Sequence, residues 1–140
     1  MRTILLIMIG ISSLMAVNPN GVVNDNKTNL EWQDDYSDNN NSIKNTTWQS
    51  AIDYCENLNL DGKSDWRLPN LNELTSLLDY TRYNPSIDSI FQNTDSDFYW
   101  SSTSNVLNND NAWLVNFDYG YQTGSHKDYS YYVRCVRAGQ

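Results

Sequence analysis

Histidine and cysteine are scarce in this 140-residue chain, which has one histidine, His126, and two cysteines, Cys55 and Cys135. A histidine-based zinc site or a nucleophilic triad needs a histidine beside further metal ligands or a nucleophile. His126 lies in a polar stretch with no second histidine or cysteine nearby in the sequence, so we interpret it as a surface residue. Aspartate and glutamate are plentiful, but their spacing singles out no catalytic pair of carboxylates. The sequence therefore predicts a protein that is not an enzyme.

Positive charge is scarce as well. Nine Lys and Arg residues against 17 Asp and Glu residues give a net charge of −8 at pH 7. A surface of this sign repels phosphate backbones and sulfated polysaccharides, so nucleic acid is excluded as a partner. Only 19% of the residues are charged whereas 13% are aromatic, and this balance favours an exported, β-rich domain over a helical bundle.

The only long apolar run covers residues 4–11, between Arg2 and the small residue Ala16. A basic start, an apolar run and a small residue are typical of a secretory signal peptide, which we predict over 1–16. The run is too short to span about 30 Å of hydrocarbon, so an uncleaved anchor is the weaker alternative. We expect a domain of residues 17–140 that is periplasmic, on the cell surface or secreted, without stable membrane insertion after cleavage.

Residues 17–140 have room for one small domain. Two short strands around the polar turn 24–27 predict a hairpin over 21–32. The segment 34–45 consists mostly of Asp, Asn and Ser, and we expect a surface loop there. In the C-terminal third, short aromatic strands between turns rich in Asn, Asp and Gly predict a small antiparallel sheet. These strands cover 98–102, 112–117 and 131–136.

Two helices are predicted between residues 46 and 78. The first follows a cap at Thr46 or Thr47 and places Cys55 on its apolar face. The other residues of that face are Trp48, Ala51, Ile52 and Leu58. The second helix begins at Asn70, which with Glu73 matches a capping box. Its predicted buried stripe consists of Leu71, Leu74, Leu77 and Leu78.

The sharpest motif of the chain is Trp66-Arg67-Leu68-Pro69, and further motifs occupy 30–34, 99–103 and 133–137. From about Val22 to the C-terminus these motifs resemble the Lcl C-terminal domain family, named after a collagen-like Legionella adhesin. The resemblance implies an α+β, C-type lectin-like fold, similar to that of formylglycine-generating enzymes, with two helices packed on a small twisted antiparallel sheet. It also implies one disulfide from the first helix to the last strand, which here joins Cys55 to Cys135.

The disulfide has one alternative, in which Cys55 and Cys135 are reduced core residues of a cytosolic protein. The predicted export favours the disulfide. The resemblance also bears on catalysis, because formylglycine-generating relatives use reactive cysteines beyond the structural pair and iron-dependent relatives use a histidine-rich cluster. The sequence has neither feature, so the resemblance carries over no catalytic activity.

A tyrosine-rich stretch in the C-terminal third is the candidate ligand-binding region. Similar folds present their ligand surface there, and tyrosine provides broad contact area at a low cost in entropy. The candidate residues are Asn116, Asp118, Tyr119, Tyr121, Lys127 and Tyr129. The alternative is a strand face that is merely covered by tyrosines.

Calcium is the one cofactor for which we name candidate ligands, because it takes hard oxygen ligands. These residues are Asp95, Asp97, Asn109 and Asp110. The alternative is two solvated turns, in which Asn and Asp are favoured for backbone reasons. The sugar-binding motifs of C-type lectins do not occur, so the resemblance does not imply a calcium-bridged sugar. The expectation is a protein without a cofactor.

Taken together, these patterns predict an exported, non-catalytic binding or adhesion module whose loops recognise a glycan or a protein. Two alternatives stay open. In the first, the chain is a structural component of an envelope assembly. In the second, it is an enzyme on the same scaffold, with a carboxylate or metal site that the sequence does not single out.

Overall fold

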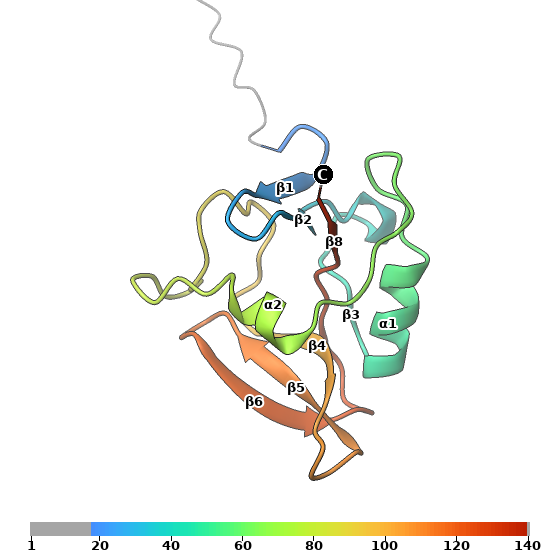
Figure 1. Ribbon diagram of the computed structural model, residues 1–140, viewed down its shortest axis with the longest axis vertical. Coiled ribbons are helices and arrows are strands. Elements are labelled where there is room, and N and C mark those ends of the chain that lie inside the picture. The colour runs from blue at the N-terminus through green and yellow to red at the C-terminus, as the bar shows by residue number, and fades with distance from the viewer. Residues whose placement is uncertain (1–17, 140) are drawn as a thin grey trace, which may run out of the picture.

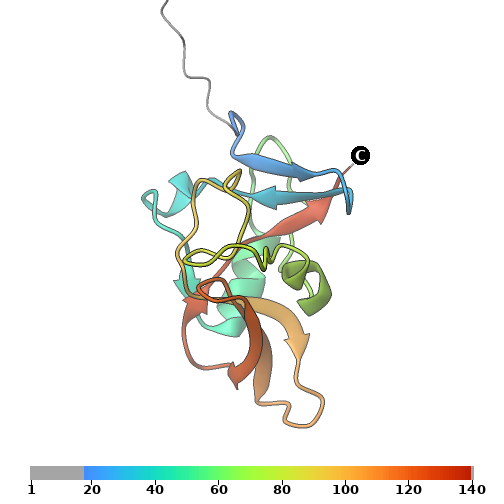
Figure 2. The same cartoon turned by 90° about the vertical axis from the view of Figure 1, so that its left-hand side faces the viewer.

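The computed structural model describes residues 18–139 as a mixed α+β domain with two sheets and two α-helices (Figures 1 and 2). The predicted signal peptide, 1–16, lies outside the described residues. Within 18–139, no helix is long and apolar enough to cross a membrane. The α+β class is confirmed. The single antiparallel sheet that we predicted is wrong, because the strands divide between two sheets.

Both ends of the described chain enter a three-stranded antiparallel sheet of order β1-β2-β8. Its strands are β1 (Val22–Asp25), β2 (Leu30–Gln33) and β8 (Val136–Ala138). Trp32 on the central strand pairs with Val23 on one side and with Val136 on the other. The predicted hairpin over 21–32 is confirmed, and the Asp25 carboxylate closes its turn by accepting a hydrogen bond from the Lys27 amide at 2.9 Å.

The second sheet has five strands in the order β3-β7-β4-β5-β6. These are β3 (Asn45–Thr46), β7 (Tyr131–Tyr132), β4 (Phe98–Ser104), β5 (Asn111–Asn116) and β6 (Tyr121–His126). One pairing is parallel, between β4 and β7 at Tyr99 and Tyr132. After β7 the chain continues into β8, which pairs with β2 in the other sheet. Our prediction of a wholly antiparallel arrangement is therefore corrected.

The first helix, α1 (Trp48–Glu56), buries Ala51 and Cys55, as its apolar face predicts. Thr47 is its N-cap residue, although the Thr47 side chain makes no capping hydrogen bond. The Trp48 indole instead donates to the Ser101 carbonyl of β4 at 2.9 Å. The helix is thus held against the five-stranded sheet by its first residue and by its buried face.

The second helix, α2 (Leu71–Thr75), is shorter than its predicted leucine stripe. The capping box is confirmed, because Asn70 accepts a hydrogen bond from the Glu73 amide and Glu73 accepts one from the Asn70 amide. Beyond the helix, the Leu77 amide donates to the Leu74 carbonyl three residues back, which tightens the turn. Leu77 still reaches the core, since only 9% of it is exposed.

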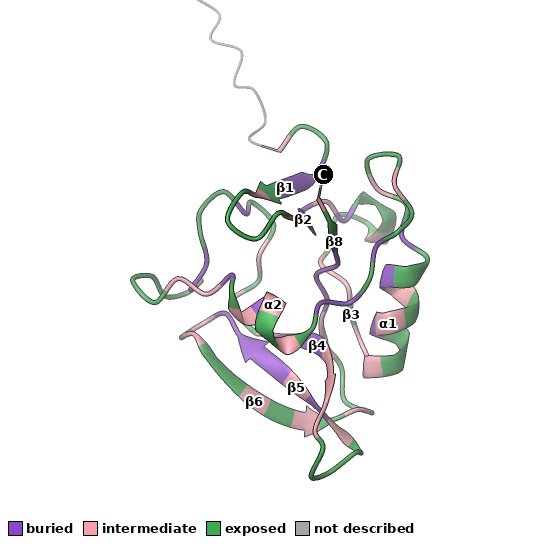
Figure 3. Ribbon diagram, in the orientation of Figure 1, coloured by how far each residue is buried: buried purple, intermediate pink, exposed green. Residues whose placement is uncertain are grey.

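The core lies on both faces of β4, because successive residues of a strand point to opposite sides. Trp100 belongs to a cluster that includes Ala51 and Cys55 of α1. Tyr99 belongs to a second cluster that includes Leu74 of α2 and Trp32 of the three-stranded sheet. Figure 3 shows the result: β5 is largely buried between its neighbours, whereas β6 forms an exposed edge.

Most of the segment 34–45 is exposed or half-buried, as expected for a surface loop, but Asp34 and Tyr36 are buried. The Asp34 carboxylate faces Arg134 across 3.3 Å, and the Tyr36 hydroxyl donates to the Val133 carbonyl at 2.9 Å. A polar segment can enter a core when each buried polar group finds a partner. Those partners come from the other end of the chain.

Candidate functional site

The six candidate ligand-binding residues lie in two separate places. Asn116, Asp118, Tyr119 and Tyr121 are in or beside the turn that joins β5 to β6. Lys127 and Tyr129 follow the opposite end of β6, because residue 111 of β5 pairs with residue 126 and residue 116 pairs with residue 121. The structure therefore brings the first four residues together and leaves the last two apart from them.

The four candidate calcium ligands are divided in the same way. Asp95 and Asp97 precede β4, whereas Asn109 and Asp110 lie in the loop between β4 and β5, at the other end of that hairpin. The Asp97 carboxylate accepts a hydrogen bond from the Phe98 amide at 2.7 Å. Within residues 18–139 there is no group of three or more His, Cys, Asp and Glu side chains placed to hold a metal ion.

The turn between β5 and β6 is organised by Asn116. Its side-chain oxygen accepts hydrogen bonds from the amides of Asp118 and Tyr119, at 2.9 and 3.0 Å. Asn116 itself is buried. Gly120 completes the turn at a φ of 82°, in the left-handed region where glycine is favoured. The buried side chain of Asn116 thus fixes the shape of the turn, whereas Tyr119 is exposed.

A second turn, formed by residues 79–86, is fastened to the first. The Asn84 amide donates to the Asp118 carbonyl at 2.7 Å, and the Ser86 amide donates to the Phe117 carbonyl at 2.7 Å. The Ser86 hydroxyl adds a hydrogen bond to the Asp118 carbonyl at 2.9 Å. Figures 1 and 2 show the loop that follows α2 lying beside the β5–β6 turn. Two chain segments about thirty residues apart therefore form one surface.

This surface carries four exposed tyrosines, which we call the tyrosine surface: Tyr80, Tyr83, Tyr119 and Tyr121. Their exposed fractions are 75%, 75%, 72% and 47%. Tyr121 is the most anchored of them, because its ring packs edge-on against Phe98 at 5.9 Å between centroids. Tyr80 and Tyr83 are not among the residues that the sequence predicted to bind a ligand. The available signal was a polar, aromatic stretch, Tyr80 to Pro85, of the same character as the one that drew attention to residues 116–129.

A groove of about 600 Å³ opens beside Tyr80, and we call it the Tyr80 groove. It lies between the β1–β2 turn and the segment 76–91. Val23, Leu77 and Phe91 form its buried apolar base. Because Tyr80 belongs to both features, the groove continues the tyrosine surface. Its volume is within the range of about 300–1,000 Å³ that is usual for ligand sites.

The other two candidate residues have structural contacts. The Lys127 ammonium lies over the Trp48 ring at 4.1 Å from the centroid, and the Lys127 amide donates to the Asp110 carbonyl at 2.9 Å. The Tyr129 ring lies 6.0 Å from that of His126. Lys127 thus fastens the loop after β6 to the start of α1.

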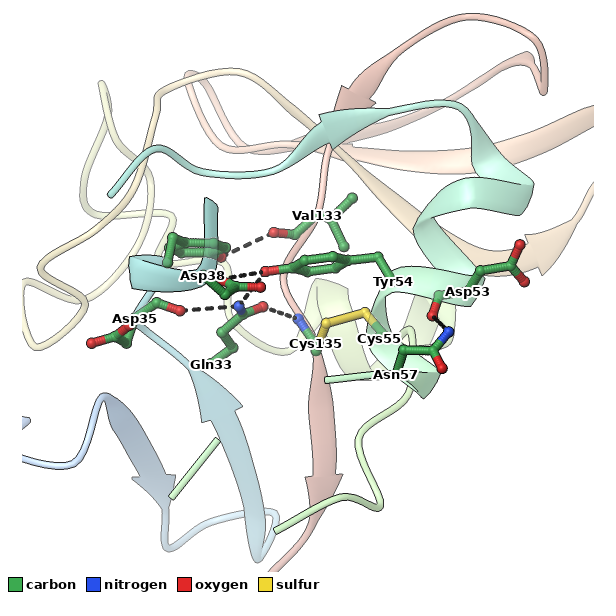
Figure 4. The surroundings of a disulfide bond; sticks show 10 residues. Gln33, Asp35, Asp38, Asp53, Tyr54, Cys55, Asn57, Val133 and Cys135 are labelled. Atoms are coloured by element: carbon green, nitrogen blue, oxygen red, sulfur yellow. Dashed lines mark hydrogen bonds between the residues drawn. A yellow bond between two sulfur atoms is a disulfide. The ribbon is translucent and has the colours of Figure 1, made fainter. Parts of the chain in front are cut away.

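The cysteines form the predicted disulfide, which joins Cys55 of α1 to Cys135 just before β8 (Figure 4). Gln33 of β2 braces this bridge. Its side-chain oxygen accepts a hydrogen bond from the Cys135 amide at 3.2 Å, and its side-chain nitrogen donates to the Tyr54 hydroxyl at 2.9 Å. Burial raises the pKa of that Tyr54 hydroxyl above its usual range. The two cysteines therefore hold the fold together.

The most buried carboxylates are also engaged in ion pairs. Asp34 pairs with Arg134, and Glu31 pairs with Arg137. Arg137 reaches Asp65 as well, at 2.6 Å. Arg134 and Arg137 thus tie the end of the chain to β2 and the residue after it, and Arg137 also holds the segment between α1 and α2.

The amino-acid sequence matches one known protein family. The sequence model of one protein family, the Lcl C-terminal domain, matches residues 21–137. This range includes all of both sheets except the last residue of β8, and it includes both helices, the disulfide and the tyrosine surface. A search of curated proteins finds no match to the chain.

Proposed function

Because the chain belongs to the Lcl C-terminal domain family over residues 21–137, we propose that it is an exported, non-catalytic adhesion module. In this proposal a signal peptide over 1–16 directs export, and the domain has a C-type lectin-like arrangement. The tyrosine surface binds a glycan or a protein outside the cytoplasm. The disulfide supports the proposed location, because such bonds persist in oxidising compartments.

The observation that carries the proposal is the tyrosine surface itself. Exposed aromatic side chains that gather in one place are typical of interaction sites. Tyr80, Tyr83 and Tyr119 are each about three-quarters exposed. They stand on two turns that three hydrogen bonds hold together. A surface already held in place loses little conformational entropy when it binds a ligand.

The polar groups around these tyrosines suit a ligand rich in hydrogen-bonding groups. Asp118 and Asn84 lie on the same two turns, and Gln122 follows Tyr121 on β6, where its side chain donates to the Thr75 hydroxyl at 2.6 Å. Tyrosine combines a broad apolar face with a hydroxyl group. The surface can therefore cover an apolar face of a ligand and exchange hydrogen bonds at its margin.

The proposal is tested by measuring retention of the oxidised protein on arrays of immobilised glycans and extracellular proteins. Replacing Tyr83 or Tyr119 by alanine is expected to weaken binding about tenfold or more, because tyrosines dominate many interfaces. Tyr129→Ala is the matched control, since Tyr129 is 62% exposed but lies beyond the other end of β6. Binding should be equal with calcium and with a chelator.

Two results would overturn the proposal. One is full retention by the Tyr83→Ala and Tyr119→Ala proteins together with loss in Tyr129→Ala, which would move the site to the far end of β6. The other is absence of any retained ligand with the wild-type protein, which would favour a structural role in an envelope assembly.

A further inference from the structure

The Tyr80 groove has an acidic margin above its apolar base. Three carboxylates line it, those of Asp25, Asp79 and Asp88, and Lys27 is the only cationic side chain among the lining residues. Ion pairs do not neutralise these three carboxylates, because none of them lies within ion-pair distance of a cation in the described part of the chain. The groove therefore presents net negative charge next to the tyrosine surface.

The three carboxylates are held in fixed positions. Asp25 accepts hydrogen bonds from the Lys27 amide and the Thr28 hydroxyl, at 2.9 and 2.7 Å. Asp79 accepts them from the amide and the hydroxyl of Thr81, at 2.9 and 2.6 Å. Asp88 accepts one from the Ile90 amide at 2.9 Å. Each aspartate thus caps its own turn while it remains at the margin of the groove.

The ionisation of two of these groups is also favoured. Hydrogen bonds from Thr81 lower the pKa of Asp79. Partial burial on its own raises the pKa of Asp25, but hydrogen bonds from Thr28 and Lys27 outweigh it, so that this pKa too is lowered. At neutral pH the margin is negative, and it lies on a chain whose net charge of −8 attracts cations at long range.

We propose that the ligand is an amino-sugar polysaccharide with free amino groups. This inference rests on the proposed function. The sugar rings of the polysaccharide lie on the tyrosine surface, and its ammonium groups enter the Tyr80 groove, where Asp25, Asp79 and Asp88 accept them. Tyrosine rings also attract cations through their π faces, so Tyr80, at the junction, contributes to both parts of the site.

A sugar chain fits these observations better than a basic peptide does. Extended peptides are recognised through pockets for alternate side chains, whereas Tyr83 and Tyr119 stand on open surface rather than in such pockets. The neighbouring Asn84 and Gln122 provide amide groups that suit hydroxyl-rich rings. The acidic margin in turn distinguishes an amino sugar from a neutral or a sulfated one, because it repels sulfate.

The test compares four probes by titration calorimetry with the full oxidised protein. The probes are a β-1,4-linked glucosamine hexamer, its fully N-acetylated counterpart, a glucose hexamer and hexalysine. We expect the glucosamine hexamer to bind at least about tenfold more tightly than each of the others, because only it combines sugar rings with charged donors for the carboxylates. Raising the salt from about 50 to about 200 mM should weaken it, because screening reduces charge attraction.

Charge-removing variants test whether the carboxylates of the groove bind the ammonium groups. The double change Asp79→Asn and Asp88→Asn keeps an oxygen acceptor for each turn and should weaken binding of the glucosamine hexamer about tenfold. The matched control is Asp110→Asn with Asp128→Asn, which removes the same charge from exposed positions near the other end of β6. Lys27→Gln removes the cation of the groove and should tighten binding about twofold to threefold. This gain cannot result from misfolding.

Several outcomes would overturn the inference. Equal binding of the N-acetylated hexamer would show that the amine is not recognised, and equal binding of hexalysine would indicate a basic peptide as partner. An equal loss in the control pair would show that only net charge matters. If the glucosamine hexamer does not bind while Tyr83→Ala still abolishes retention on the arrays, the ligand class is wrong and the proposed function stands.

Discussion

Asp34 and Arg134 form an ion pair in which both side chains are 1% exposed, although they are 100 positions apart in the sequence. Asp34 also accepts hydrogen bonds from the amides of Gln92 and Asn93, at 2.9 and 3.0 Å. Arg134 in turn donates to the Asn93 carbonyl at 2.6 Å and to the Thr94 hydroxyl at 2.9 Å. The pair therefore fastens the segment that leads into β4, where regular secondary structure is absent between Thr75 and Phe98.

Replacing Asp34 by alanine should lower the free energy of unfolding by about 3–5 kcal/mol, because Arg134 would be left buried without its partner. Urea unfolding followed by tryptophan fluorescence measures the change. Asp53→Asn, at an exposed position on α1, is the control and should change stability by less than about 0.5 kcal/mol. Equal stability of the two variants would contradict the role assigned to the pair.

Stability should decline on acidification, in part through Glu73. Two hydrogen bonds from Arg67, both 2.7 Å, lower the pKa of Glu73 below its ordinary value of 4.5 in the folded protein. A group whose pKa is lowered by folding stabilises the protein above its unfolded pKa, and this contribution is lost as the pH falls through the folded pKa. The loss should therefore begin near pH 4.5 and continue below it.

Glu73→Gln isolates this contribution, because glutamine keeps the capping hydrogen bond to the Asn70 amide but cannot titrate. We expect the decline in unfolding free energy at acidic pH to be shallower in this variant than in the wild type. Glu56→Gln, on an exposed residue at the end of α1, serves as the control. A decline in Glu73→Gln as steep as in the wild type would refute the assignment.

The Cys55–Cys135 bridge closes a loop of 80 positions. On a chain-entropy basis such a bridge stabilises a protein by about 4.5 kcal/mol, and measured values are often smaller. The double variant Cys55→Ala and Cys135→Ala should therefore lose about 2–5 kcal/mol in urea unfolding. In the wild type, alkylation without reductant should modify neither cysteine. Modification of both thiols under those conditions would show that the bridge does not form.

Two glycines with similar backbone angles allow the contact between the two tyrosine-bearing turns to be tested. Gly120 has a φ of 82° and Gly62 a φ of 69°. A Cβ atom at Gly120 would lie 3.4 Å from the Cβ and Oγ atoms of Ser86, whereas a Cβ atom at Gly62 would meet nothing within 4 Å. Gly62→Ala should cost about 1 kcal/mol through backbone strain alone.

Gly120→Ala should cost at least as much as Gly62→Ala, because both glycines have a positive φ and the added methyl group also comes into contact with Ser86. The strain at Gly120 falls on the turn that Ser86 fastens to the turn carrying Tyr80 and Tyr83, so this variant should also weaken ligand retention on the arrays. Thermal unfolding and array binding measure the two effects. If Gly62→Ala impaired retention as strongly as Gly120→Ala, the contact between the turns would have no part in binding.

Local patterns in the sequence predicted local structure well. The valines before the turn at Asp25, the Asn70–Glu73 capping box and the apolar face of α1 each depend on residues close together in the chain. The disulfide followed from a family resemblance and from predicted export. Turns rich in Asn, Asp and Gly were predicted between the C-terminal strands, and the structure has such a turn between β5 and β6.

Long-range relationships escaped prediction for a physical reason. Asp34 sits in a polar segment that reads as an exposed loop, and its burial depends on Arg134 at the other end of the chain. Tyr83 joins Tyr119 only because backbone amides of one turn donate hydrogen bonds to backbone carbonyls of the other, and such bonds carry no residue-specific signal. The candidate ligand-binding and calcium-binding residues were likewise grouped because they are close in the sequence. In the structure, a strand lies between the members of each group, so they are at opposite ends of the sheet.

The position of the disulfide has a mechanical consequence. A pulling force applied between the two ends of the described chain passes from Cys55 to Cys135 through the covalent bridge and bypasses residues 56–134. Tension can shear the strands β1, β2 and β8, which lie outside the closed loop, but it cannot extend the loop itself. All four tyrosines of the tyrosine surface are inside that loop. A tethered molecule of this kind can bear load at its ends while the part that holds the ligand is not stretched.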